Sequence, residues 1–268
     1  MVESIDPKSE WLRKLYDHLP FSVNAIDSIL NHTERTEIYE LKRGVNSIYG
    51  VVFNSSYNPH IWYSPIIWFF GLSDDKENLG YLFNYFIQKY KTFIGLSELQ
   101  TDLFGLFGVR TYSELLMIKN KSVNPSIKND YKIRLLETED AEQSIRLSSD
   151  VEPGSNRPSN IECEKLFLRE RETYGIFLND TLVCRGSIMA NVASYSTVGG
   201  FVTDPNYRGM GLAKFLVNYI NEIVEYRGYK SVLTVRKTNQ IAISLYQKLG
   251  FEKMQEVTFI DAGSGVVP

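Results

Sequence analysis

One segment, Gly199-Gly-Phe-Val-Thr-Asp-Pro-Asn-Tyr-Arg-Gly-Met-Gly-Leu-Ala213, carries the clearest chemical signal in the chain. Its pattern predicts a strand that runs through a glycine-bearing turn into an amphipathic helix. Such a turn points several unpaired backbone N–H groups at one place, where the helix dipole adds positive potential. Gly209 and Gly211 have no Cβ to obstruct an anion, and Arg208 can add a charge-assisted contact. The segment predicts a phosphate-binding loop, although two glycines alone are also typical of a tight strand-to-helix turn.

Two further segments accompany this loop in a fixed order. Ile133-Arg-Leu-Leu-Glu-Thr-Glu-Asp140 predicts a first strand and helix, and Asn239-Gln-Ile-Ala-Ile-Ser-Leu-Tyr-Gln-Lys-Leu-Gly-Phe251 predicts a last helix. Together the three segments resemble the GNAT acetyltransferase superfamily over about half of the chain. The family motif, Gln/Arg-x-x-Gly-x-Gly/Ala after a strand, holds the CoA pyrophosphate on backbone amides. Asn206 stands where the family prefers Gln or Arg, which weakens the side-chain part of the match and leaves the backbone part intact.

The resemblance implies that the strand before the loop is splayed from its neighbour, so that free backbone groups pair with the pantetheine arm. An ordinary central strand is the alternative, but paired glycines at 199 and 200 would weaken it without another use. The residues expected to contact acetyl-CoA are Gly200, Phe201, Val202, Thr203, Tyr207, Arg208, Gly209, Met210, Gly211, Leu212, Ala213, Asn239 and Tyr246.

Tyr246 is the candidate acid, because the resemblance implies that a Tyr at this helical position protonates the leaving thiolate. A phenol with an ordinary pKa of about 10 is protonated at neutral pH and can supply that proton. Its alternative role is packing, since Ala242, Leu245, Tyr246 and Leu249 form one apolar stripe. Asn239 is expected first as a helix N-cap and second as a CoA contact.

The general base is open at the level of the sequence. The predicted strand at residues 195–203 has no carboxylate. A water held by backbone carbonyls, by Ser196 or by Thr197 is one route, and Glu152 is another. The resemblance implies that the loop of Glu152 borders the acceptor site, but a solvated loop Glu is the alternative. Cys184 is expected in the core rather than as a nucleophile, because no base adjoins it in the sequence.

An internal duplication is indicated by a second comparison within the chain. The pattern of elements restarts after the polar stretch 119–130, and residues 102–118 align without gaps on residues 244–260. We therefore expect an α/β (α+β) protein of two GNAT-like domains, residues 1–125 and 130–262. Each domain is expected to hold a mixed, mostly antiparallel sheet flanked by helices.

The first of these domains is expected to be degenerate. Ser73-Asp-Asp-Lys-Glu77 precedes its long helix, with three carboxylates and no glycine, and carboxylates there would repel a pyrophosphate. Phe104 takes the aligned place of Tyr246, so the hydroxyl is missing as well. An active domain beside a degenerate one resembles the tandem layout of glycine N-acyltransferase-like proteins.

Bulk properties restrict the class of protein. The 268 residues have a formal net charge of -3 and a sequence pI near 5.8, which does not suit a general nucleic-acid binder. The longest apolar stretch, residues 61–72, is too short to cross a bilayer and is broken by Pro65. Two free, buried cysteines suit a reducing cytoplasm, and three scattered histidines give no metal site.

The function predicted from these residues is acetyl-CoA-dependent N-acetylation of a primary amine, on a small molecule or a peptide. The amine is expected to attack the thioester directly, with the oxyanion stabilised by a strand amide near Phe201 or Val202. Acetyl-CoA enters as a substrate, and no metal, nucleic acid or membrane is required. The alternative from another class is a non-catalytic acyl-CoA-binding or regulatory module.

Overall fold

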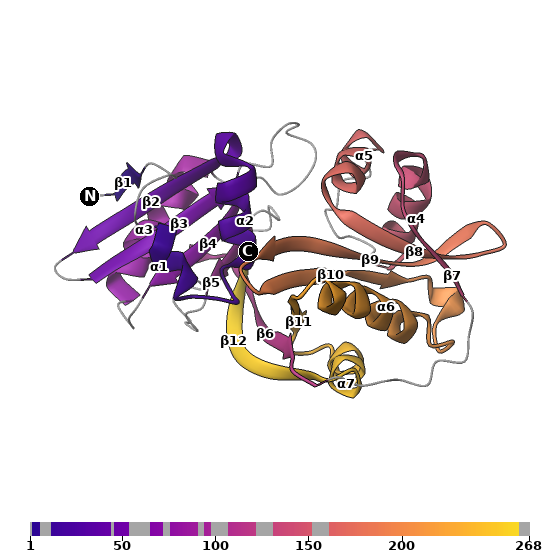
Figure 1. Ribbon diagram of the computed structural model, residues 1–268. Coiled ribbons are helices and arrows are strands. Elements are labelled where there is room, and N and C mark those ends of the chain that lie inside the picture. Colours follow the sequence, from indigo (N-terminus) through magenta and orange to yellow (C-terminus); the bar gives the residue numbers. More distant parts are fainter. Residues whose placement is uncertain are drawn as a thin grey trace. The chain divides into compact units, whose positions relative to one another are not determined.

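The computed structural model describes residues 2–5, 12–43, 46–53, 65–71, 76–90, 94–97, 107–121, 131–151 and 161–262 (Figure 1). The chain forms two compact units. Unit 1 comprises Met1–Leu116, Val235–Thr238 and Met254–Pro268, and unit 2 comprises Met117–Thr234 and Asn239–Lys253. The expected GNAT-like α/β class is confirmed, because each unit has helices packed on a largely antiparallel sheet.

Unit 1 is built on the strand order β1-β2-β3-β4-β5-β12. Among the described residues of these strands, β4 and β5 pair in parallel and the other neighbours pair antiparallel. The elements of the first half of the chain are β1 (Val2–Ile5), α1 (Leu12–Tyr16), α2 (Val23–Asn31), η1 (Thr33–Arg35), β2 (Thr36–Arg43), β3 (Asn46–Phe53), β4 (Ile66–Gly71), α3 (Lys76–Tyr90), β5 (Ile94–Ser97) and β6 (Arg110–Lys119).

Aromatic side chains fill the core of unit 1, as the composition predicts. From α3, Leu79, Phe83 and Phe86 pack against alternate residues of β2, β3 and β4. The next residue along β4, Phe70, instead meets the ring of Phe21 at 5.5 Å in a T-shaped arrangement. Successive strand residues therefore serve two faces of the sheet, with α3 on one of them.

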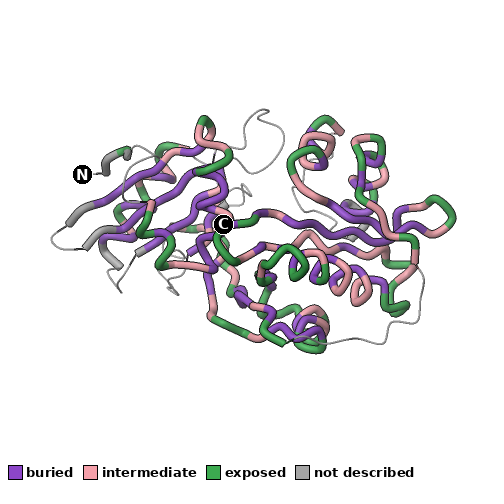
Figure 2. Tube along the Cα trace, viewed as in Figure 1, coloured by how far each residue is buried: buried purple, intermediate pink, exposed green. Residues whose placement is uncertain are grey.

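Unit 2 is built on the strand order β11-β10-β9-β8-β7. Figure 1 shows α4 and α5 on one side of these strands and α6 on the other. In Figure 2, α6 alternates between buried residues and residues that are intermediate or exposed, as expected of an amphipathic helix. The elements of the second half are β7 (Lys132–Leu135), η3 (Thr138–Asp140), α4 (Ala141–Val151), α5 (Ile161–Glu170), β8 (Glu172–Leu178), β9 (Thr181–Val192), β10 (Tyr195–Thr203), η4 (Pro205–Tyr207), α6 (Leu212–Tyr226), β11 (Lys230–Arg236), α7 (Gln240–Lys248) and β12 (Phe251–Asp261).

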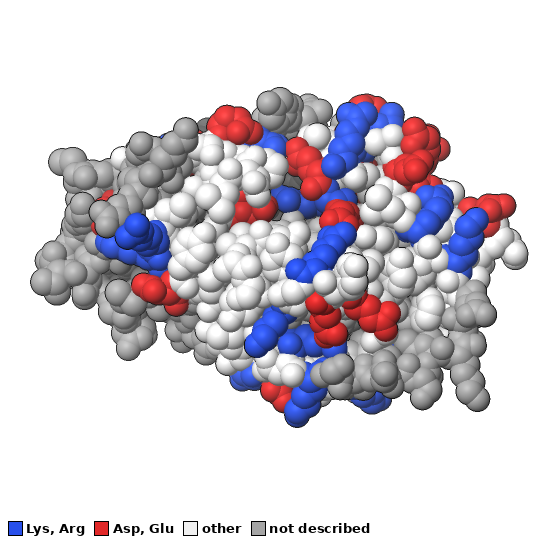
Figure 3. Space-filling view, in the orientation of Figure 1, with Lys and Arg blue, Asp and Glu red and all other residues white. Residues whose placement is uncertain are grey.

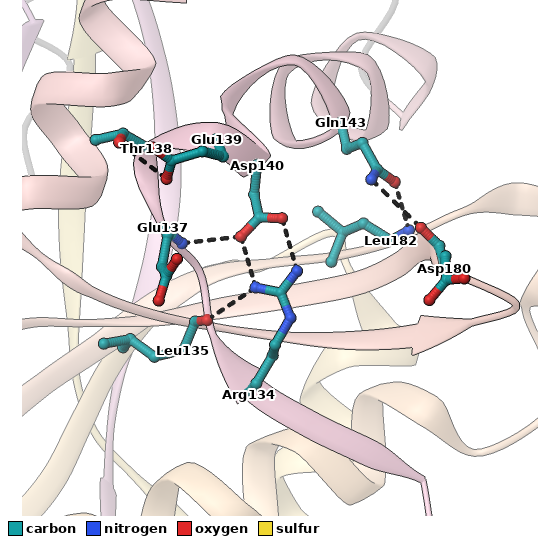
Figure 4. Close-up of polar contacts among 9 residues, drawn as sticks. All are labelled: Arg134, Leu135, Glu137, Thr138, Glu139, Asp140, Gln143, Asp180 and Leu182. Carbon is teal, nitrogen blue, oxygen red and sulfur yellow. Dashed lines mark hydrogen bonds and ion pairs between the residues drawn. The ribbon is translucent and has the colours of Figure 1, made fainter.

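A network of polar contacts fixes the corner where β7 turns into η3 and α4 (Figure 4). The guanidinium of Arg134 donates from Nη1 and Nη2 to the Asp140 carboxylate at 2.6 and 2.7 Å. The backbone N–H of Glu137 donates to the same carboxylate at 2.8 Å, which completes a capping box. Because of these contacts, led by the Arg134 hydrogen bond, the pKa of Asp140 is lowered.

Strands β8 and β9 form a hairpin across Asn179-Asp180. Both residues have positive φ angles, 48° and 61°, as the tight turn between two strands requires. The side chain of Gln143 on α4 makes two hydrogen bonds to this hairpin (Figure 4). It accepts from the backbone N–H of Leu182 at 2.8 Å and donates to the backbone carbonyl of Asp180 at 3.3 Å. The hairpin is thereby fastened to the first helix of the unit.

The described elements follow the same order in both halves: a strand, two helices, three antiparallel strands, a helix and a last strand. This last strand pairs in parallel with the third of the three antiparallel strands, as β5 does with β4 and β11 with β10. Strand β6 then begins in unit 1 and ends in unit 2, whereas β12 begins in unit 2 and ends in unit 1. These unit limits cross two strands, while the predicted domains 1–125 and 130–262 follow the chain. The predicted domains therefore stay a prediction.

Candidate functional site

Strand β10 has the geometry on which the candidate site depends. Its parallel pairing with β11 covers Tyr195, Ser196 and Thr197, opposite Lys230, Ser231 and Val232. Within these two fully described strands, no pair follows Thr197, although β10 continues to Thr203. Residues 198–203, which we call the open segment of β10, therefore present backbone groups on the β11 side that the ladder does not use. This matches the splay that the sequence predicts.

The open segment also contains a β-bulge. On its other side it pairs with β9, but the register shifts between Gly199 and Val202, and Gly200 has a φ of 65°. A bulge kinks its strand locally and re-aims side chains. Strand β9 accommodates the Phe201 ring at Gly186, which has no side chain. A Cβ added to Gly186 would lie 2.3 Å from that ring. The sequence did not single out Gly186, since its role appears only when the two strands are placed side by side.

The loop that follows β10 ends in a helix start without a side-chain cap. Asp204 accepts a hydrogen bond from the backbone N–H of Asn206 at 2.8 Å and so turns the chain into η4. Gly211 is the N-cap of α6, with a φ of 81° that L side chains rarely adopt. Cβ atoms added to Gly209 or Gly211 would meet nothing within 4 Å among the described residues. The start of α6 thus combines a backbone without a side-chain cap and open space beside both glycines, as an anion site requires.

Arg208 and Met210 are exposed beside this helix start, whereas Leu212 is buried under it. The backbone carbonyl of Met210 accepts a hydrogen bond from the Tyr131 hydroxyl at 3.2 Å, and the Tyr131 ring packs on Phe215. These contacts hold the loop against the first turn of α6. The predicted contacts of this loop that are exposed or half-buried are Thr203, Tyr207, Arg208, Gly209, Met210, Gly211 and Ala213.

Tyr246 on α7 lies beside the open segment of β10. Its ring centroid is 6.3 Å from that of Phe201 and 5.7 Å from that of Phe251. Burial raises the pKa of the Tyr246 hydroxyl to about 12. Among the described residues this hydroxyl has no hydrogen-bond partner, and it is not fully enclosed. The packing predicted for Tyr246 is confirmed, and the same placement leaves its hydroxyl available to a ligand.

The remaining predicted residues have three different outcomes. Asn239 caps α7, with its side chain accepting from the N–H of Ala242 at 3.1 Å, which confirms the N-cap role. Cys184 is fully buried, and burial raises the pKa of its thiol to about 12, which confirms a core position. Ser196 is also fully buried. Glu152 lies outside the described residues, so its candidacy as a base stays a prediction.

One charged cluster was not predicted at all. Arg185 on β9 donates to Glu164 on α5 and to Ser144 on α4, and the charged side chains are 7% and 11% exposed. These hydrogen bonds connect α4, which ends at Val151, and α5, which begins at Ile161, to strand β9 of the sheet. Charges that meet across 21 positions leave no local signal in a sequence. A buried pair of this kind costs desolvation energy, but removal of one partner leaves an uncompensated charge.

Charge on the face of the molecule seen in Figure 3 is mixed, with Lys and Arg interspersed among Asp and Glu. No helix of the described residues is both long enough and apolar enough to cross a membrane. Among the same residues, no three His, Cys, Asp or Glu side chains gather where they could hold a metal ion.

Comparison with known proteins places this geometry in context. Residues 173–260 match the family described as FR47-like protein. The chain is 32% identical over 83 residues to the [ribosomal protein bS18]-alanine N-acetyltransferase of Escherichia coli, which corresponds to 29% of this chain and 56% of that protein. The chain therefore spans little more than half the length of this curated relative.

Two solved structures resemble almost the whole chain. A GNAT-family protein from Novosphingobium aromaticivorans is 20% identical with a TM-score of 0.61, covering 92% of this chain and 99% of its own. A GCN5-related N-acetyltransferase-like protein from Streptococcus suis is 15% identical with a TM-score of 0.62, covering 94% and 98%. At such identities the similarity shows the fold of the chain, which is that of GNAT proteins.

Proposed function

We propose that this chain is an acetyl-CoA-dependent N-acetyltransferase acting on a primary amine, because residues 173–260 match the FR47-like family and the fold resembles that of a GCN5-related N-acetyltransferase-like protein. One observation carries the proposal. The pairing of β10 with β11 ends at Thr197, and the same strand leads into an uncapped, glycine-bearing helix start. An unpaired strand edge and an anion site on one continuous segment fit a long ligand with a pyrophosphate at one end.

The open segment of β10 would bind the amide-bearing arm of acetyl-CoA by strand-like pairing. The N–H groups near Gly209, Gly211 and Leu212 would hold its pyrophosphate, with Arg208 adding charge from the surface. A backbone N–H near Phe201 or Val202 would stabilise the oxyanion as the amine attacks the thioester carbonyl. Asn239, already engaged as a helix cap, would be at most a peripheral contact.

Tyr246 would protonate the leaving thiolate. The raised pKa of its hydroxyl keeps the proton in place at any working pH. A pKa near 12 also makes the phenol a weaker acid, but the apolar surroundings that raise it would raise the pKa of a neighbouring thiol as well. The free hydroxyl beside Phe201 therefore suits a short proton transfer inside a desolvated site.

The acceptor class can be tested directly with the full-length chain. Thiol release from acetyl-CoA would be followed with simple amines, amino acids and peptides, including a peptide that begins with alanine, as the name of the Escherichia coli relative suggests. Mass spectrometry of the acceptor should show one added acetyl group. Tight binding of acetyl-CoA without acetylation of any amine would count against catalysis.

The alternative is a non-catalytic acyl-CoA-binding module, and one observation favours it. No carboxylate stands on β10, where a general base would be close to the acceptor. Hydrolysis without acceptor separates the two functions, because an assembled oxyanion site should release thiol slowly even when only water attacks. A binding module should protect the thioester instead.

A further inference from the structure

Ser196 on β10, Asn221 on α6 and Ser231 on β11 are among the polar side chains of unit 2 that are completely buried, each with 0% exposure. Neither hydroxyl has a hydrogen-bond partner among the described residues, and neither do Oδ1 and Nδ2 of Asn221. Buried polar groups in proteins are almost always hydrogen-bonded, because an unpaired one loses its bonds to water without compensation. These side chains therefore point to a partner that is not a protein group.

The positions of the three residues bring them to one region. Ser196 and Ser231 are Cα partners across the parallel β10–β11 ladder, so their side chains leave the same face of neighbouring strands about 5 Å apart. The end of α6 is tied to the start of these strands, because Tyr229 donates its N–H to the carbonyl of Val224 at 3.0 Å and Lys230 donates to Ser194 at 2.8 Å. Asn221 lies one helical turn before Val224, on the buried side of α6.

We propose that Ser196, Asn221 and Ser231 enclose a buried water site between α6 and the paired part of β10 and β11. Each hydroxyl and the amide can both donate and accept, which suits a ligand that does the same. The three side chains carry no charge, so they offer nothing to balance a buried ion. An internal water commonly makes about three hydrogen bonds to otherwise unpaired buried groups, and this cluster supplies up to four atoms.

The water site lies next to the point where the strands stop pairing. Thr197, one residue after Ser196, belongs to the last β10–β11 pair. Water bridging α6 to both strands would fasten the helix at the closed end of the opening. The cluster would thus have a structural role, which does not depend on whether the chain acetylates an amine.

The direct test is a crystal structure of the full-length chain at a resolution that shows waters. Ordered water within about 3 Å of at least two of the four atoms is expected. Side chains of the cluster bonded to one another or to main-chain groups, with no water between them, would overturn the proposal.

Variants give an independent test. Asn221→Leu should expel the water and leave both serines unpaired, lowering the folded-to-unfolded ratio about tenfold in urea unfolding. The triple variant Ser196→Ala, Asn221→Leu, Ser231→Ala removes every polar atom of the cluster and should recover most of that loss. Asn218→Leu, on the same helix outside the cluster, controls for the change of residue type. A triple variant less stable than the single one would contradict a shared water site.

Discussion

The parallel pairs β4–β5 in unit 1 and β10–β11 in unit 2 occupy the same place in the order of elements but differ in how far they pair. All four residues of β5 pair with β4, from Ile94 opposite Ile66 to Ser97 opposite Phe69. Only the first three residues of β11 pair with β10. A closed ladder uses its backbone groups internally, whereas an opened one leaves them for a ligand. The same arrangement therefore leaves part of β11 unpaired with β10 in unit 2, and we infer that this is where a ligand can pair.

Helices α3 and α6, which connect the two strands of each parallel pair, also differ at their starts. Helix α6 starts at Gly211 with open space before it. The sequence at the start of α3 is Ser73-Asp-Asp-Lys-Glu77, in which Lys76 and Glu77 are the first residues of the helix and residues 72–75 lie outside the described part of the structure. Acidic side chains at a helix start stabilise it by interaction with the dipole, and they repel a phosphate. We therefore infer that unit 1 is a degenerate counterpart of unit 2, in agreement with the alignment of residues 102–118 on 244–260.

The largest expected effect of this difference is the presence or absence of a whole site. Titration of the chain with acetyl-CoA should give one site per chain, because the described residues of β5 all pair with β4 and the sequence at 72–79, around the start of α3, has no glycine. The full chain is required, since β6 and β12 are each divided between the units and a fragment would lack one of them. A stoichiometry of two would mean that unit 1 is not degenerate.

The variant Tyr246→Phe gives α7 the residue that the first half of the chain has at the aligned position, Phe104. If the hydroxyl protonates the thiolate, kcat should fall about 100-fold while the affinity for acetyl-CoA changes little, because the ring and its packing stay. Tyr226→Phe, at the end of α6, is the matched control, since this Tyr side chain is 94% exposed. Equal kcat values for the Tyr246→Phe variant and the unmodified protein, with chemistry rate-limiting, would return Tyr246 to packing alone.

Gly211→Asn makes the start of α6 less accessible without forbidding the backbone conformation. Asn tolerates a positive φ better than other L residues, and its side chain would occupy the open space before the helix. The Kd for acetyl-CoA should rise about 30-fold, which corresponds to about 2 kcal/mol for lost bonds to a charged phosphate.

Gly228→Asn supplies the control for this change. Gly228 follows the other end of α6 with a φ of 83° and nothing within 4 Å, so the conformational cost is matched while the site is untouched. An equal rise in the Kd for acetyl-CoA in both variants would contradict the assignment of the anion site to the start of α6. Arg208→Ala should have a smaller effect than Gly211→Asn, because Arg208 is exposed and solvent screens its charge.

Local patterns predicted the helices and turns of unit 2 because their causes are local. The Asn179-Asp180 turn, the cap at Asn239 and the apolar stripe of α6 each depend on residues within a few positions. The loop glycines were found for the same reason.

Pairing register explains what the sequence could not predict. The bulge at Gly200 and the end of the ladder at Thr197 depend on which residues of β9 and β11 stand opposite, and one position of slippage would change both. The burial of Ser196 and the division of β6 and β12 between the units follow from the same long-range pairing. Strand β1, at residues 2–5, gives no strand signal until β2 is beside it.

The smallest expected effect tests whether the two units unfold together. Asp140→Asn weakens the Arg134 fork in unit 2 and should cost about 1 kcal/mol, a modest value because the Arg134 side chain is 40% exposed. All three tryptophans, Trp11, Trp62 and Trp68, belong to unit 1. Since β6 and β12 are shared, the unfolding midpoint seen by tryptophan fluorescence should shift as much as the midpoint seen by circular dichroism. A fluorescence midpoint that stays unchanged would mean that the units unfold separately.

The pH dependence of this variant identifies the cause. The pKa of Asp140 is lowered in the folded protein, chiefly by the hydrogen bond from Arg134, so the carboxylate contributes stability above its unfolded pKa near 4. That stability is lost as the pH falls through the lower, folded pKa. The difference between the unmodified protein and Asp140→Asn should therefore be constant from pH 7 to about pH 5 and shrink below pH 4. Glu162→Gln, which removes an exposed partner of Lys165 on α5, should change stability little at any pH. A difference for Asp140→Asn that persists unchanged at pH 2 would assign the loss to packing of the corner rather than to its ion pair.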